Sequence, residues 1–203
     1  MPTWTTPLDF PAGIRITDVS ITAENSVGIR ESPSSYRQEV QVFGGQRMRM
    51  RVSFKEEDPE LGSRLETFFL KLRGSAGVFR FFDPYHSKPM GQAMGLPVVV
   101  AALKGEQTLE TSGWLPNVNF QLRAGDYIQI EDNLHRVLDD VHSDSDGDAT
   151  LTLWPDLRAS HAPGESIKLI NPTGLWRLAR DPSFDRRPEN QKHQTSMECV
   201  EVR

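Results

Sequence analysis

Three aspartates alternate around a glycine in the stretch SDSDGDATLTLWP, residues 143–155, and carboxylates at this spacing are used by calcium loops. Such a loop has its glycine at position six and a bidentate glutamate at position twelve. Counted from Asp144, the glycine here is fourth and the twelfth residue is Pro155, which has no side-chain oxygen. The Asp-Gly pair and the alternating segment after it are typical of a turn that enters a strand. We therefore predict a turn and no specific metal site, with weak surface calcium binding left open at Asp144, Asp146 and Asp148.

Other residue types that could carry chemistry are scattered along the chain. The histidines lie in no HExxH pattern and at no ligand spacing on one element: His86, His135, His142, His161 and His193. There is no GxSxG nucleophile elbow and no glycine-rich phosphate loop. We therefore expect no enzyme, no bound cofactor and no metal centre, which argues against a small hydrolase.

Composition excludes further classes of protein. Residues 95–171 hold five Lys or Arg against twelve Asp or Glu, and the remainder holds 18 against 16, so neither part has the basic surface of a nucleic-acid binder. The single cysteine, Cys199, cannot form an intrachain disulfide. Because no apolar run approaches the roughly 18 residues of a membrane span, we expect a soluble protein made in the cytoplasm, without membrane insertion.

The first part of the chain predicts strands and a hairpin. Residues 14–22 have a strand-like pattern, and residues 36–54 predict two strands joined at Gly44-Gly45. In the second of these strands three arginines alternate with apolar residues and share one face. This ladder is either a solvated face or a face that contacts another subunit or lines a lumen, and it consists of Arg47, Arg49 and Arg51.

A helix and an aromatic strand follow. Between Asp58 and Gly74 the apolar residues recur with helical spacing. Asp58 is a candidate N-cap, Pro59 suits the first helical position, and Gly74 is expected to close the helix in the left-handed conformation. The strand GVFRFFDP, which begins at Gly77, then supplies aromatic residues to the core.

From Gly95 onward the segments are shorter. Residues 96–103, 125–130, 134–141, 149–154 and 165–170 predict strands, with a loop over residues 105–116, and this spacing predicts a small all-β barrel or sandwich. The C-terminal part predicts a polar loop over 180–194 and a closing strand over 195–203. The fold class expected is mainly β with one helix.

Two segments resemble tail-tip proteins of long-tailed bacteriophages, in particular the distal tail protein and minor tail protein group. They are RLETFFLKLRGSAGVFRFFDPYHSKPMG, residues 64–91, and LRAGDYIQIEDNLHRVLDDVHSDSDGDATLTLWPDLRAS, residues 122–160. The order of the predicted elements extends the likeness over most of the chain. It is a pattern of hydrophobicity and turns and contains no catalytic signature.

The resemblance implies a belt domain that forms a ring, usually a hexamer, in the virion tail, and joins the tail tube to the baseplate or tip hub. Residues 1–94 and 172–203 would form this split β-sandwich or barrel with its amphipathic helix, and residues 95–171 an inserted all-β barrel. The arginine ladder would contact the next subunit. Trp4 and Leu8 would dock on an adjacent tail protein, although Trp4 fits core anchoring equally well.

One alternative of another class stays open at this stage. A β-sandwich that binds carbohydrate stacks sugar rings on exposed aromatic side chains, and Trp114, Tyr127 and Trp154 are the candidates. Aromatic side chains in small barrels also serve as core residues.

Overall fold

The computed structural model describes residues 6–56, 58–187 and 192–202. Strands make up 48% of the chain and helices 11%, so the expected mainly β class is confirmed. The chain divides into two compact units, each made of separate segments. Unit 1 holds residues 1–10, 78–176 and 202–203, and unit 2 holds residues 11–77 and 177–201. The domain boundaries expected between residues 94 and 95 and between residues 171 and 172 both fall inside unit 1.

The sheet of unit 2 is built on two long strands, β2 (Ile16–Glu31) and β3 (Gln38–Glu56). β3 pairs antiparallel with β2 on one side and with β13 (Lys192–Glu201) on the other, as expected of a C-terminal strand that returns to the sheet. β12 (Phe184–Arg187) pairs with β13. The polar loop predicted over 180–194 is thus wrong in part, because a strand forms within it.

The hairpin turn of unit 2 does not lie at Gly44-Gly45, which corrects the sequence prediction. β3 runs through both glycines, and the turn lies between β2 and β3, closed by hydrogen bonds between Ser32 and Arg37 and from Tyr36 N to Ser32 O. The two glycines occupy an irregularity in the β2–β3 pairing, between Asn25 and Val27 on the opposite strand. Glycine suits a bulge as well as a turn, because both need backbone conformations that other residues rarely adopt.

Helix α1 (Pro59–Leu72) covers one face of this sheet. Asp58 caps its N-terminus by accepting a hydrogen bond from Glu60 N at 2.8 Å, as predicted. The C-cap is Arg73 in the left-handed conformation (φ 51°), and Gly74 is also left-handed (φ 66°), as expected of the residue that closes the helix; a 3₁₀ turn, η1 (Gly74–Ala76), follows. The apolar stripe of α1 is buried with the inner face of β3, and the core residues of this region include Leu65, Phe68, Phe69, Leu72, Met48, Met50, Val52 and Phe54.

Unit 1 contains a six-stranded sheet that is nearly closed into a barrel. Its order is β10-β7-β8-β9-β6-β5. The strands are β5 (Gly95–Ala101), β6 (Thr108–Trp114), β7 (Tyr127–Ile130), β8 (Asn133–Val137), β9 (Ala149–Trp154) and β10 (Ile167–Lys168). β6 lies inside the loop predicted over 105–116, which corrects that prediction. The barrel core is aliphatic and includes Leu109, Leu122, Ile128, Ile130, Leu151 and Leu153.

The remaining short strands include β11 (Gly174–Leu178), whose last two residues belong to unit 2. β1 (Leu8–Asp9) pairs parallel with β4 (Phe79–Phe81), and β4 pairs antiparallel with β11. A 3₁₀ turn, η2 (Pro84–His86), follows β4. Among the described residues no helix has the length and apolar character that a membrane crossing requires.

Candidate functional site

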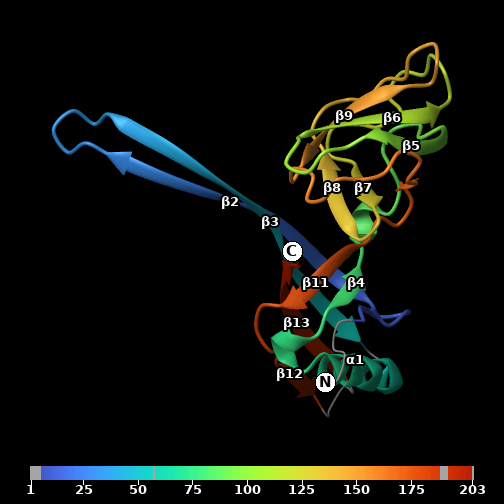
Figure 1. The fold of residues 1–203 in the computed structure, drawn as a ribbon. Helices are drawn as coiled ribbons and strands as arrows, with labels where there is room; N and C mark the ends of the chain where they lie inside the picture. The colour runs from blue at the N-terminus through green and yellow to red at the C-terminus, as the bar shows by residue number, and fades with distance from the viewer. Residues whose placement is uncertain (1–5, 57, 188–191, 203) are drawn as a thin grey trace. The chain divides into compact units, whose positions relative to one another are not determined.

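The most distinctive feature of unit 2 is an arm, residues 25–46, formed by the outer parts of β2 and β3 (Figure 1). Pairing between β13 and β3 ends where Val200 faces Arg49. Beyond that point the described strands β2 and β3 pair only with each other. An isolated two-stranded hairpin is at best marginally stable in water, so the arm is a weakly stabilised part of unit 2.

One face of the arm is apolar and exposed. Val27 faces Val42 across the two strands, and Ile29 faces Val40. Their exposed fractions are 43% for Val27, 72% for Val42, 64% for Ile29 and 57% for Val40. Cross-strand apolar pairs of this kind normally form the buried face of a sheet. We refer to these four side chains as the apolar strip.

The apolar strip continues the inner face of the sheet. Side chains alternate between faces along a strand, so Val27 and Ile29 continue the row of Val19 and Ile21 on β2. Those two residues are half-buried near the base, whereas the strip is exposed. The sequence therefore extends a core-type face past the part of unit 2 that covers it.

The opposite face of the arm is polar and carries one aromatic ring. Across the two strands Arg30 faces Glu39, and Gly28 faces Gln41. Phe43 lies over Gly28, where a Cβ atom would come within 3.0 Å of the ring. The absence of a side chain at Gly28 thus makes room for this ring, which is itself 60% exposed. The arm is therefore amphipathic.

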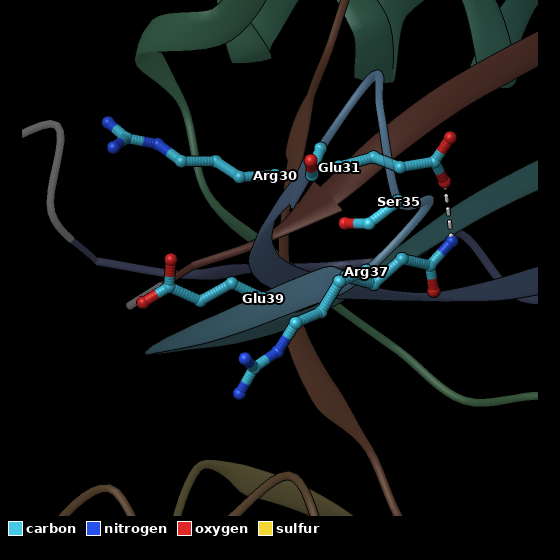
Figure 2. A pocket seen from close by; sticks show the side chains of 7 residues that line it. Arg30, Glu31, Ser35, Arg37 and Glu39 are labelled. Carbon is cyan, nitrogen blue, oxygen red and sulfur yellow. Dashed lines mark hydrogen bonds between the residues drawn. The ribbon is translucent and has the colours of Figure 1, made fainter.

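At the tip the arm forms a hollow of about 620 Å³, seen in Figure 2. Gln38 Nε2 donates a hydrogen bond to Glu31 Oε2 at 2.8 Å across its rim. Charges of both signs surround the hollow and no single sign dominates, which suits a contact with another polar protein surface more than binding of one anion or cation. The lining residues are Arg30, Glu31, Ser32, Ser35, Arg37, Gln38 and Glu39.

The arginine ladder lies on β3, at and below the base of the arm. Arg47 Nε and Arg49 Nε both donate to the carboxylate of Glu24 on β2, at 2.5 and 2.7 Å. These two hydrogen bonds lower the pKa of Glu24. Arg51 is exposed and faces Ser20 on β2 and Glu198 on β13. Two of the three predicted contact arginines thus have a partner within the chain.

A cluster of possible metal ligands lies at one end of the barrel. His161 Nδ1 lies 2.8 Å from a carboxylate oxygen of Glu165 and 3.9 Å from one of Glu131. Glu165 also accepts a hydrogen bond from Ala162 N, and this bond, followed by the one with His161, lowers the pKa of Glu165. The His161–Glu165 pair therefore closes a tight turn, and the sequence pattern had not indicated it.

Two buried titratable groups are chemically inert in their surroundings. His135 is fully buried, and this burial lowers its pKa to about 4. The hydrogen bond between its Nδ1 and Pro155 O, at 2.8 Å, acts in the opposite direction and raises the pKa. Burial also raises the pKa of the Cys199 thiol, in the core of unit 2. Neutral imidazole and protonated thiol are the stable forms at pH 7.

The aspartates of the stretch 143–155 form a turn before β9. Asp144 N donates to Asp148 O, and the Oδ1 atom of Asp144 accepts from Asp146 N and Asp148 N, both at 2.9 Å. These backbone hydrogen bonds lower the pKa of Asp144. One carboxylate of the three is thus engaged in shaping the turn.

The aromatic candidates for sugar stacking do not form an exposed platform. Trp114 and Tyr127 are 3% and 5% exposed, and Trp114 Nε1 donates to Thr111 Oγ1 within the barrel. Burial also raises the pKa of Tyr127. Trp154 is half-buried. A sugar ring would reach neither of the first two faces.

Of the two N-terminal residues predicted to dock on an adjacent protein, the structure describes only Leu8. Trp4 lies outside the described residues. Leu8 is half-buried and belongs to β1, where its N–H donates to Val78 O at 2.9 Å. The backbone of Leu8 is therefore used within unit 1.

Comparison with known proteins does not place the chain in a family: no family model matches it, and a search of curated proteins finds no match.

Proposed function

We propose that the protein is a structural component of a long-tailed-phage type of tail tip, where copies of it form a ring that connects the tail tube to the baseplate or tip hub. The observation that carries this proposal is the amphipathic arm with its exposed apolar strip. Exposed apolar faces and open strand edges promote uncontrolled association unless a defined partner covers them. A ring with rotational symmetry covers each such surface once.

Burial of the strip would contribute favourably to assembly. Full burial of a Val or Ile side chain is worth roughly 1.5–3 kcal/mol, so the four side chains together offer several kcal/mol. The resemblance of residues 64–91 and 122–160 to tail-tip proteins supplies the biological setting. A structural role also fits the buried, inert state of His135 and Cys199.

Carbohydrate binding receives no support from the site geometry, because Trp114 and Tyr127 are buried in the barrel. We therefore do not develop it as a second function.

The test is the mass of the purified full chain, measured by light scattering and native mass spectrometry, together with negative-stain imaging. A closed ring of about six copies is the expected result. A protein that stays monomeric up to its solubility limit would contradict the proposal. Immunogold labelling of intact tail particles from producing cells should place the protein at one end of the tail.

A further inference from the structure

We propose that the apolar strip of the arm docks on strand β5 of the barrel in a second copy of the chain. The inference rests on the proposed function in that it supplies the contact between neighbouring copies in the ring. The two surfaces belong to different units, and each is an exposed row of apolar side chains.

The receiving surface is a second apolar row with strand spacing. Along β5, Pro97 and Val99 point into the barrel, whereas the side chains between them point outward. Leu96 is 85% exposed and Val100 is 40% exposed. We refer to Leu96, Val98 and Val100 as the β5 patch. Like the apolar strip, it uses every second residue along the chain. The pairing of β5 with β6 is irregular between Gly95 and Val98 and between Val99 and Ala101, so this row is less regular than the strip.

Charge favours the same pairing. Residues 24–51, which include the arm and the ladder, contain five arginines and three glutamates, whereas residues 95–171 contain five basic and twelve acidic residues. Beside the β5 patch, Glu110 on β6 is exposed and faces Ala101 across the strands. The arm itself is balanced in charge, and the basic excess lies in the arginine ladder at its base. An acidic barrel attracts this base, and such attraction sets orientation and association rate more than affinity.

The arm supplies part of one side of the interface. One side of a standard protein interface uses roughly 20–30 residues, and only the residues on the strip face of the arm, residues 25–46, can contact β5. A nucleic acid would need a surface of one sign, but the arm carries both signs.

The partner that covers the strip is a second copy of the chain, because every copy presents both the strip and the patch as separate surfaces. When each copy gives its arm and receives its neighbour's arm on β5, the contact is heterologous, and such contacts close into a ring when the rotation between copies closes. Arm-to-arm packing would instead be isologous and would stop at a dimer.

Single substitutions test the two surfaces. Val42→Glu in the strip and Leu96→Glu in the patch should each weaken self-association at least about 30-fold, as expected for residues at the centre of an interface. Gln41→Glu changes the neighbouring residue on the opposite face of the arm and should leave association within about threefold. Leu138→Glu, an exposed leucine just beyond β8, is the matching control for the barrel. Circular dichroism and thermal unfolding establish that each variant folds.

Mixing the two variants decides the orientation of the contact. Val42→Glu keeps a working patch and Leu96→Glu keeps a working strip, so the mixture should form a one-to-one heterodimer, seen by native mass spectrometry with one variant labelled with ¹⁵N. Loss of association in Val42→Glu alone, with Leu96→Glu unaffected, would overturn the proposal in favour of arm-to-arm packing. A ring that survives both substitutions would overturn it while leaving the proposed function standing. A monomeric wild-type chain would instead refute the proposed function itself.

Discussion

At the scale of single residues, the buried imidazole of His135 makes the stability of the folded chain depend on pH. His135 has a pKa of about 4 in the folded chain because burial disfavours the imidazolium, with Arg158 and His161 acting in the same direction. An unfolded histidine has a pKa near 6.5. Between about pH 4 and pH 6.5 the unfolded chain therefore binds a proton at His135 that the folded chain does not bind.

We predict that His135 lowers stability as the pH falls. Above pH 6.5 both states are neutral and His135 adds no pH dependence. From pH 6.5 to 4 the free energy of unfolding should fall by about 1.4 kcal/mol per pH unit, to a total of about 3 kcal/mol. Urea denaturation across this range should show that His135→Gln removes that slope, whereas His142→Gln at an exposed position keeps it. An unchanged slope in His135→Gln would refute the assignment.

A second residue-scale prediction concerns Asp126, which is buried. Its two carboxylate oxygens accept hydrogen bonds from Met90 N at 2.7 Å, Gly91 N at 3.2 Å and Arg123 N at 2.8 Å. Asp126→Ala leaves these donors without their acceptor and should cost about 2–4 kcal/mol in chemical denaturation. Asp140→Ala, at an exposed carboxylate, should cost less than about 1 kcal/mol. Equal costs for the two would contradict the role of Asp126.

At the scale of elements, the arm is the segment whose stability depends least on its own unit. It is paired through β2 and β3 alone among the described strands and buries little of its apolar face. Core packing of unit 2 lies below it, between α1 and the inner face of β3, where Phe54 and Phe69 lie with ring centres 6.5 Å apart.

We therefore predict that the arm can be removed without unfolding unit 2. Replacing residues 26–45 by a two-residue Asn-Gly turn should change the melting temperature of the isolated chain by less than about 4 °C and should abolish self-association. Thermal unfolding and light scattering give the two readouts. A chain that fails to fold without its arm would show that the arm belongs to the core of its own unit.

At the scale of the whole molecule, each unit is assembled from segments far apart in the chain. The β5 patch belongs to unit 1, and the arm belongs to unit 2. One chain thus carries the two different exposed surfaces that the proposed contact between copies requires. This is the minimum that a closed ring of identical subunits requires.

The sequence by itself determined the elements that local chemistry specifies. Asp58 caps the helix and Pro59 starts it, because capping and the first turn depend on adjacent residues. Period-two alternation indicated β9 and other strands of the barrel but not β6, and the single helix followed from its apolar stripe. The mainly β class could be read from these patterns without any contact between distant residues.

Only the tertiary structure decided where the long hairpin turns and which apolar faces stay exposed. The sequence prediction placed the turn at Gly44-Gly45, although the Pro-Ser segment at 33–35 also carries turn residues, because a glycine pair fits a bulge and a turn equally well. Val27, Ile29, Val40 and Val42 have the pattern of core residues, and alternation cannot tell whether a partner element covers them. Burial depends on the packing of distant segments, and that packing left these four side chains exposed on the arm.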